Sequence, residues 1–357
     1  MKERLYLDHA ATTPMLPQAR EAMAAALEEW ANPSSPHGEG RAARAALEDA
    51  RTRIKAALDW PHELIFTSGA SEAIALATSC SKADRTIVST VEHDAVQRAA
   101  ADAERLPVDR NGIVDGGKLN WLLAGTDSRA LVAIQSVNNE TGVAQDLTDL
   151  DARIAVGGNL LLADCSQSAG KWPLPDADFV AISAHKLGGS PGIGALLVRD
   201  LAELHALGGQ EKGYRPGTEN LPAAIGFAAA VEAPKGWLGR AEGLRDHLDK
   251  AIEQEGGTVV ARDADRIPTI ASYRMPGVAA SAQLIQFDMA GIAVSAGSAC
   301  SSGSLKPSHV LAAMGWDEKE ASEVIRVSFG PDTKRADIYR FIDTWKRLAK
   351  EAKSRAA

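Results

Sequence analysis

A cysteine among small polar residues is the first feature of this sequence that could do chemistry. Cys300 lies in VSAGSACSSGSL, residues 294–305, where Gly297 and Gly303 flank it and serines fill most other positions. Cysteine is usually buried as a small hydrophobic residue, yet no bulky apolar neighbour here could bury it. Because glycine and serine lower the resistance to backbone motion, we expect a mobile loop over about 295–306. The alternative is a small residue in a flexible surface loop.

A lysine directly after an apolar segment is the second feature. The stretch DFVAISAHKLGG predicts a buried strand that delivers Ser183, His185 and Lys186 into a glycine-rich loop. Burial disfavours the charged ammonium and lowers the pKa of a lysine, which makes Lys186 a candidate to form an imine with a carbonyl group. On a solvated loop the same lysine would have no special chemistry.

Two more apolar segments end in residues with polar or titratable side chains. NLLLADCSQS ends on Asp164, followed closely by Gln167, and a carboxylate there needs a partner because burying an unpaired charge is costly. TIVSTVEHDAV supplies His93, which could stack on a flat ring or act as acid and base. The simpler alternative for both Asp164 and His93 is that each caps the helix that follows.

A fourth segment, LIFTSGASEAIALA, predicts a strand, a turn at Gly69 and a helix from about Ser71. Free backbone N–H groups and the positive end of the helix dipole suit such a turn to phosphate, although Ser71 could be only an N-cap. An imine-forming lysine, an aspartate for a pyridinium nitrogen and a helix N-terminus for phosphate are what pyridoxal phosphate requires of a protein. Since ligands bind at the carboxyl ends of strands in open α/β sheets, we expect these groups to meet.

The segments that must position these groups alternate between strand and helix patterns. Short apolar runs recur from residue 64 to about 199, separated by Ala-rich or charged periodic stretches: LIFTS, TIVST, ALVAIQSV, NLLLAD, DFVAIS and GALLVR. This alternation is typical of βαβ units and a largely parallel sheet buried on both faces. A helical stretch broken at Pro234-Lys235-Gly236 leads to shorter α+β elements. We therefore expect an α/β fold with a large domain over 13–240 and a small domain made of 1–12 and 241–357, with the Cys300 loop in the small domain.

Composition limits the partners and the compartment. The 357 residues are 45% hydrophobic and carry a formal net charge of -8, which argues against a nucleic-acid or anionic-membrane surface. Cys80, Cys165 and Cys300 lie too far apart for a C-x-x-C pair, and an odd count does not suit a disulfide framework, so we expect free thiols in a reducing compartment. No apolar run reaches the roughly 18 residues of a membrane span, and we expect a cytoplasmic protein.

The sequence also resembles a known family along nearly its whole length. The matching segments are LYLDHAATTP (5–14), NPSSPHGEGRAAR (32–44), FTSGASEA (66–73), EHDAV (92–96), VNNETG (137–142), SAHKLGGSPGIGAL (183–196), YRPGTEN (214–220), SAGSACSSGSLKPSHVL (295–311) and IRVSFG (325–330). In this order they resemble the motifs of cysteine desulfurases, in the class V branch of the fold-type I pyridoxal-phosphate aminotransferases. The cysteine segment resembles the group I, or NifS-type, version, which carries the nucleophile on a long mobile loop.

The resemblance implies roles for the residues already singled out. Lys186 would hold pyridoxal 5'-phosphate through an imine and take the substrate's Cα proton, while Cys300 would attack the substrate sulfur. Asp164 would pair with the pyridine nitrogen, Gln167 would hydrogen-bond the ring oxygen, and His93 would stack on the ring. Because the thiolate is the nucleophile, the proton of the attacking thiol needs an acceptor, and the two candidates are His93 and the substrate itself.

Other implied contacts surround the cofactor and the substrate. The phosphate side would be lined by Ala70, Ser71, Ser183 and His185. Thr218 would reach the phosphate of the neighbouring subunit in a homodimer, and Asn139 would contact cofactor or substrate. Arg326 would bind the substrate carboxylate through its bidentate guanidinium; the alternative is a surface charge at a strand end. No metal is implied.

Three positions depart from the family pattern. Ser71 stands where threonine is common, a change that keeps the hydroxyl. Cys165 follows Asp164 where alanine is usual, so a second thiol either faces the cofactor or is a small buried residue. Lys306 stands where the family usually has glutamate, which reverses a charge beside the loop.

The leading hypothesis is a dimeric cysteine desulfurase that converts L-cysteine to L-alanine and passes sulfur from Cys300 to a protein acceptor, such as an Fe-S scaffold or a sulfur carrier. The alternatives are a selenocysteine lyase, a class V aminotransferase in which Cys300 is idle, and a non-catalytic homologue that only binds a sulfur carrier.

Overall fold

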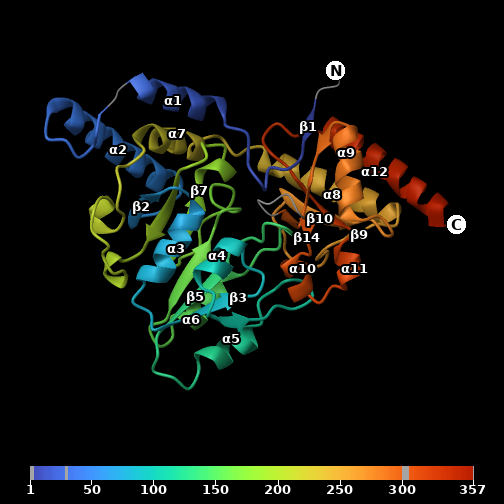
Figure 1. Ribbon diagram of the computed structural model, residues 1–357, viewed down its shortest axis with the longest axis horizontal. Helices are drawn as coiled ribbons and strands as arrows, with labels where there is room; N and C mark the ends of the chain where they lie inside the picture. The colour runs from blue at the N-terminus through green and yellow to red at the C-terminus, as the bar shows by residue number, and fades with distance from the viewer. Residues whose placement is uncertain (1–3, 29–30, 300–304, 357) are drawn as a thin grey trace.

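A seven-stranded sheet forms the larger half of the computed structural model, which describes residues 4–28, 31–299 and 305–356 (Figure 1). In spatial order the strands are β2 (Glu63–Thr67), β8 (Gly194–Val198), β7 (Phe179–Ser183), β6 (Leu160–Asp164), β5 (Ala130–Gln135), β3 (Arg85–Ser89) and β4 (Glu104–Leu106). β8 is antiparallel to β2 and β7, and the other paired neighbours are parallel. The predicted mostly parallel α/β sheet is confirmed, and each of the six apolar runs contributes a strand.

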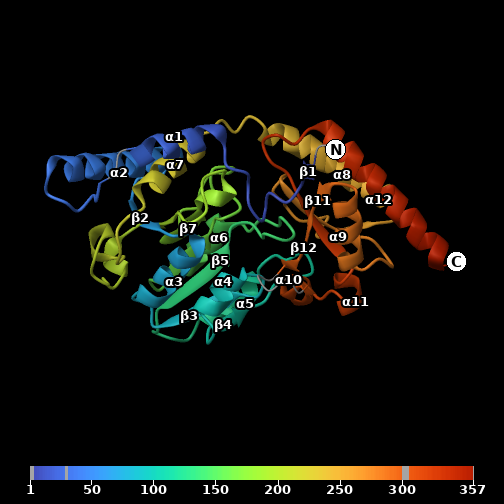
Figure 2. The same cartoon turned by 45° about the horizontal axis from the view of Figure 1, so that its top comes forward.

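Helices cover both faces of this sheet, because neighbouring side chains of each strand point to opposite sides. Leu64 and Phe66 of β2 pack in one hydrophobic cluster, whereas Ile65 between them packs in another. The first face is covered by α2 (Gly38–Ala57), α5 (Gly116–Leu123), α6 (Leu147–Ile154) and α7 (Leu221–Val231), and the second by α3 (Ala70–Cys80) and α4 (Asp94–Ala99). Figure 2 shows α1 (Pro17–Glu28) lying beside α2 and α7. Burial on both faces explains why the strands read as continuous apolar runs.

A smaller antiparallel sheet forms the second half. Its order is β12 (Ser295–Ala296), β15 (Val324–Ser328), β10 (Ile270–Arg274) and β9 (Thr258–Val259). It packs with α8 (Leu238–Gln254), α9 (Ala280–Met289) and α12 (Arg335–Ala356) around a core in which the Phe287 and Phe341 rings stack with centroids 4.7 Å apart. The sheet therefore has a hydrophobic core of its own.

A short connection joins the two halves, and several short elements complete the fold. α7 ends at Val231 and α8 begins at Leu238, so the predicted break at 234–236 is confirmed. β1 (Leu5–Tyr6) pairs with β11 (Ile292–Ala293), and β13 (Ser298–Ala299) pairs with β14 (Leu305–Lys306). The remaining elements are α10 (His309–Ala313), α11 (Glu318–Ala321) and the 3-10 turns η1 (Ala184–Lys186), η2 (Leu201–Glu203) and η3 (Glu211–Gly213). Across the described ranges, every helix is too short or too polar to cross a bilayer.

Candidate active site

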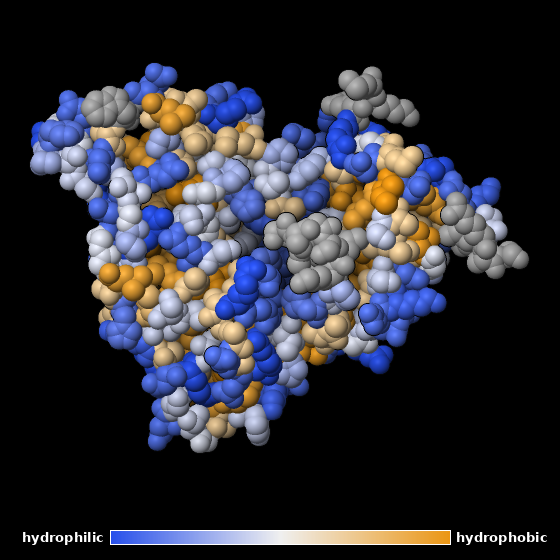
Figure 3. All heavy atoms as spheres, viewed as in Figure 1, coloured by the Kyte–Doolittle hydropathy of each residue, from blue (hydrophilic) through white to orange (hydrophobic). Residues whose placement is uncertain are grey.

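A cleft of about 1400 Å³ opens between the two sheets, at the carboxyl ends of β5, β6 and β7. In Figure 3 this middle part of the face is hollowed and hydrophilic residues gather along it. Most of the residues singled out in the sequence line this cleft, from both halves of the fold: Ala70, Ser71, His93, Asn139, Asp164, Gln167, Ser183, His185, Lys186 and Arg326. Thr218 does not line it. Cys300 lies outside the described residues, between β13 and β14.

Lys186 reaches the cleft from the single turn η1 that follows the buried strand β7. Its Nζ donates hydrogen bonds to the carbonyl oxygens of Ala10 at 2.6 Å and Ala11 at 2.8 Å. Burial, with Arg326 nearby, lowers the pKa of Lys186 from 10.5 to about 8. The amine is therefore held by the N-terminal segment and is more readily neutral than an exposed lysine, as the sequence predicts.

Asp164 and Gln167 lie on the floor of the cleft after β6. Asp164 Oδ1 accepts hydrogen bonds from the backbone N–H of Ser166 at 2.9 Å and from its hydroxyl at 2.5 Å. Gln167 Nε2 donates to Ala10 O at 2.9 Å, whereas its buried Oε1 has no hydrogen-bond partner in the described part of the chain. A buried amide oxygen without a partner is costly, so this floor is suited to a polar ligand.

His93 both caps a helix and faces the cleft. Its Nδ1 accepts a hydrogen bond from Ala95 N at 3.1 Å at the start of α4, so the capping alternative holds together with the cleft position. Burial lowers the pKa of His93; the negative charge of Asp164 opposes this shift and the positive charge of Lys186 adds to it. With Nδ1 accepting, the neutral ring carries its proton on Nε2.

The N-terminus of α3 forms one end of the cleft. The helix begins at Ala70, and its N-cap is Gly69, which has no side chain to accept from the free N–H groups. Ser71 lies in the first turn, so the alternative that Ser71 is the N-cap is wrong. Ser183 and His185 approach this end from the β7 side. An uncapped helix start beside hydroxyl and imidazole groups is suited to a phosphate.

Arg326 enters the cleft from β15 of the small sheet and is only 5% exposed, so the alternative of a surface charge is wrong. Its Nη2 donates to Asp8 Oδ1 at 2.8 Å and its Nη1 to Asn139 O at 3.0 Å. Its buried Nε has no partner in the described part of the chain. Asp8, which the sequence analysis did not single out, thus orients the guanidinium, which keeps capacity for a carboxylate.

Two buried carboxyl groups beside the cleft were also missed. Glu92 accepts from Gln135 N at 2.8 Å, and burial raises its pKa well above the usual range, with the negative charge of Asp164 adding to the effect. Glu140 accepts from the Ser308 hydroxyl at 2.6 Å, and burial raises its pKa as well. A Cβ on Gly297 would lie 2.6 Å from Glu140 Oε2. Glu140 therefore contacts both flanks of the segment that contains Cys300.

Cys165 is fully buried and does not line the cleft. It packs in the hydrophobic cluster on the α2 and α7 face of the large sheet, and burial raises its pKa from 9.0 to about 12. Between the two alternatives for this thiol, the structure supports a small buried residue.

Thr218 is exposed and lies in the loop between η3 and α7. The same loop is tied to the cleft by Arg215, whose Nε donates to Glu72 Oε1 of α3 at 2.8 Å. The expected contact of Thr218 with a neighbouring subunit therefore stays a prediction. Of Lys306, the structure describes the backbone in β14.

These residues fit pyridoxal phosphate by their chemistry. The floor offers a carboxylate and an unpartnered amide, the wall offers an imidazole, one end offers an uncapped helix, and Lys186 offers an amine with a lowered pKa. Among the described residues, no group of three or more His, Cys, Asp or Glu side chains could hold a metal ion.

Comparisons with known proteins agree with this chemistry. Residues 5–341 match the family described as aminotransferase class-V. A cysteine desulfurase IscS of Dictyoglomus turgidum is 34% identical, covering 99% of this chain and 96% of its own. A solved NifS-like protein of Rickettsia africae superposes with a TM-score of 0.89 at 30% identity, covering 98% of this chain and all of its own. SspA, solved in complex with cysteine, gives a TM-score of 0.80 at 29% identity over 92% of this chain and 99% of its own.

Proposed function

We propose a set of residue roles for this chain, which belongs to the class-V aminotransferase family and is a pyridoxal phosphate-dependent cysteine desulfurase. The observation that carries the proposal is the convergence of Lys186, Asp164, His93 and Arg326, from both halves of the fold, on one cleft. Cys300 completes the proposed set. The substrate is L-cysteine, as the solved complex of SspA with cysteine supports.

Lys186 is the proposed proton carrier at the substrate Cα. When bound, pyridoxal phosphate supplies an electron sink for the carbanion formed there. The amine of Lys186, once free of the cofactor, takes the Cα proton in its neutral form, which the lowered pKa favours. Asp164 supplies the negative charge that keeps a pyridine nitrogen protonated, and Gln167 supplies its free amide oxygen as a polar partner on the floor.

Arg326 and Asn139 are the proposed substrate-binding residues. The guanidinium is fixed by Asp8 and by the Asn139 carbonyl, and its remaining N–H groups are suited to the carboxylate of an amino acid. Fixing the group before the substrate arrives reduces the ordering cost of binding. Ala70, Ser71, Ser183 and His185 bind the phosphate end of the cofactor in this proposal.

Cys300 is the proposed sulfur acceptor. Its thiolate attacks the sulfur of L-cysteine, an S–S bond forms, and the C–S bond breaks with its electron pair left on the substrate carbon. Two protons then complete L-alanine, so that one L-cysteine and one thiol give one L-alanine and one persulfide. His93 is the proposed acceptor of the thiol proton, and for this Nδ1 must release the backbone N–H of Ala95, because Nε2 of the neutral ring already carries a proton.

The test compares the wild type with Cys300→Ser, scoring alanine and persulfide together from L-cysteine. We expect the variant to retain the visible absorbance of the bound cofactor but to form neither product at a useful rate. Normal alanine formation by Cys300→Ser would contradict the proposal and favour an aminotransferase-like reaction. L-Selenocysteine is run in parallel, since turnover of that substrate alone would favour a selenocysteine lyase.

The proposed assembly is a cytoplasmic homodimer that hands sulfur to a protein acceptor. Thr218, exposed in this chain, would complete the phosphate site of the partner subunit. Separate hydrophobic cores support the proposed division into a large domain over 13–240 and a small domain of 1–12 and 241–357. Sedimentation of the holoenzyme and of Thr218→Ala tests the assembly: a monomeric, fully active wild type would contradict it.

A further inference from the structure

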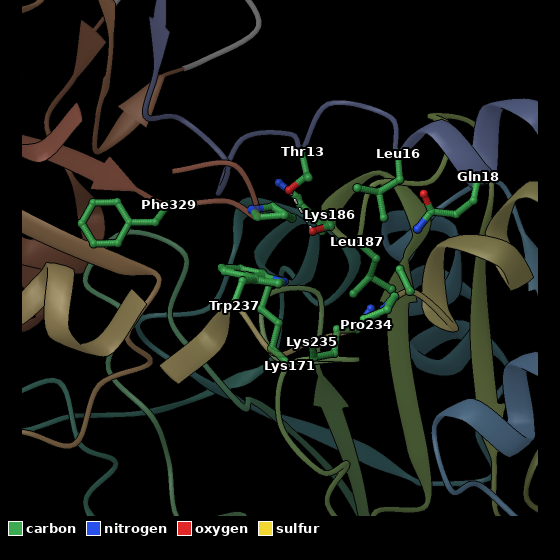
Figure 4. A pocket seen from close by; sticks show the side chains of 12 residues that line it. Thr13, Leu16, Gln18, Lys171, Lys186, Leu187, Pro234, Lys235, Trp237 and Phe329 are labelled. Carbon is green, nitrogen blue, oxygen red and sulfur yellow. Dashed lines mark hydrogen bonds between the residues drawn. The ribbon is translucent and has the colours of Figure 1, made fainter. Parts of the chain in front are cut away.

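A second, smaller cavity of about 130 Å³ lies behind Lys186 (Figure 4). We call it the lysine pocket, because three lysines line it: Lys171, Lys186 and Lys235. Of the residues in the described ranges, Lys186 alone lines both this pocket and the large cleft. In Figure 4, Trp237, Lys171 and Lys235 lie on the side opposite Thr13 and Leu16. The pocket is thus distinct from the cleft in which the desulfurase chemistry takes place.

The described residues do not balance the positive charge of the lysine pocket. Among those that line it there is no aspartate or glutamate. Within residues 4–28, 31–299 and 305–356, neither Lys171 nor Lys235 forms an ion pair. Lys171 Nζ donates one hydrogen bond, to Gln167 O at 3.0 Å, and Lys235 Nζ donates one, to Ala230 O at 3.3 Å. Since an ammonium has three N–H donors, each amine has unused donor capacity.

The amine of Lys235 lies close to the backbone of the residue next to Lys171. Gly170, which directly precedes Lys171, has a φ of +65°, and a Cβ built on it would lie 3.5 Å from Cε and 3.9 Å from Nζ of Lys235. Lys235 therefore folds over the residue next to Lys171. Burying cations together without a counter-charge is unfavourable. A bound anion would therefore lower the free energy of the two buried ammonium groups.

Neutral donors add to the lysines. The pocket is also lined by Trp237 and Gln18. In the part of the chain that the structure describes, no hydrogen bond involves the Trp237 indole or the Gln18 amide. An indole N–H is a donor only, and an amide NH₂ offers two donors. The polar groups with spare capacity are thus mainly donors, as an oxyanion requires.

Protonation of Lys171 is sensitive to this environment. Burial, followed by the charges of Lys186 and Lys235, lowers the pKa of Lys171 from 10.5 to about 7. His9, which also faces Lys171, has a pKa lowered by burial to about 4 and is neutral near pH 7. An anion would favour the protonated amine, so by linkage its affinity must fall as pH rises through about 7.

We propose that the lysine pocket binds a small oxyanion, either a carboxylate or an inorganic sulfate or phosphate, between Lys171 and Lys235. The cavity has room for only a few heavy atoms. This site goes beyond the proposed function, because neither the substrate nor the cofactor needs it.

The solution test uses the holoenzyme, in which the cofactor fills the phosphate end of the cleft. Sulfate, phosphate and acetate are titrated separately by calorimetry at constant ionic strength. We expect saturable binding of at least one anion, weakened about tenfold or more in Lys235→Met, since a charge-assisted hydrogen bond contributes about 1.5–3 kcal/mol. Lys250→Met, at an exposed position of α8, is the matched control and should bind like the wild type.

Further measurements distinguish binding in the lysine pocket from general effects of ionic strength. Trp237→Phe keeps the ring and should weaken binding by a smaller factor, about fivefold for one neutral hydrogen bond. Affinity should be lower at pH 8.5 than at pH 6 in the wild type. A crystal of the holoenzyme soaked in selenate should show anomalous density between Lys171 and Lys235. Absence of saturable binding in the wild type, or equal affinity in the wild type and Lys235→Met, would overturn the proposal.

Discussion

The large cleft and the lysine pocket share Lys186 but differ in charge: the cleft contains side chains of both signs, whereas the charged side chains described in the pocket are all lysines. In the cleft, Arg326 is paired with Asp8, and Asp164 faces His93 and Lys186. In the lysine pocket, Lys171 and Lys235 have only backbone carbonyls as partners among the residues that the structure describes. A site that brings its own counter-charges can hold a zwitterionic amino acid in one orientation, whereas a site with one sign of charge can only select for the opposite sign.

The largest expected effect is a difference in activity between substitutions of Lys186, which lines both cavities, and Lys171, which lines the lysine pocket. Lys186→Ala should lower alanine formation by about 10³-fold or more, because the group that we propose to bind the cofactor and to carry the Cα proton is lost. Lys171→Met should keep turnover within about tenfold of the wild type, since its amine faces the other cavity. Steady-state kinetics with L-cysteine measures both. If Lys171→Met lost activity as completely as Lys186→Ala, the two regions would not be functionally separate.

A smaller effect tests the charge pairing of the cleft itself. Arg326→Gln should lower kcat/KM for L-cysteine by about 10²-fold, mainly through KM, because two charge-assisted hydrogen bonds to the carboxylate are lost. Arg326→Lys should recover only part of this loss, since an ammonium cannot replace a bidentate guanidinium. An unchanged KM in Arg326→Gln would show that the guanidinium does not bind the substrate.

The pH dependence of the free energy of unfolding tests the environment of Lys171 in the lysine pocket. The folded protein holds the pKa of Lys171 at about 7, below 10.5, so the unfolded chain binds more protons between these values. The titration of Lys171 therefore increases the free energy of unfolding as pH rises from about 7 toward about 10.5. Lys171→Met should lack this increase. Chemical denaturation of both proteins across this range measures the difference in slope. Sulfate should flatten the slope of the wild type, and an identical slope in both proteins would contradict the titration of Lys171.

The smallest effect concerns a thiol that faces neither cavity. Cys165→Ala should leave alanine and persulfide formation unchanged and should cost about 1 kcal/mol of stability, because only a small buried group is removed. Its pKa of about 12 keeps the thiol protonated and unreactive at neutral pH. Mass spectrometry of the persulfide-labelled enzyme measures the outcome, and label on Cys165 would be inconsistent with its burial.

The strand ends were predictable from the sequence because the signal is local. Asp164, Lys186 and His93 each follow a continuous apolar run, and a run of that kind specifies both the strand and the point where it ends. The residue at the strand end then lies at the ligand-binding edge of the sheet. The break before α8 was predictable from a different local signal, because Pro234 and Gly236 interrupt a helical pattern.

The residues that were missed depend on contacts between distant parts of the chain. Asp8 acquires its role only through Arg326, and the carbonyl of Ala10 only through Lys186 and Gln167. No local pattern marks such partners. The wrong N-cap has a different cause: Ser71 is a favourable capping residue by type, but the backbone turns at Gly69.

The segment from Leu5 to Thr13 contacts both Lys186 and Arg326, and so links the two halves of the fold at the large cleft. It pairs with β11 at Leu5, orients Arg326 through Asp8, holds Lys186 through Ala10, and donates from Thr13 Oγ1 to Lys186 O at 3.1 Å. During translation this stretch is made early, yet its partners near residues 292 and 326 emerge from the ribosome among the last. The large sheet can thus form on the nascent chain before the small sheet is synthesised, and the cleft is complete only when the small sheet packs against a segment made long before it.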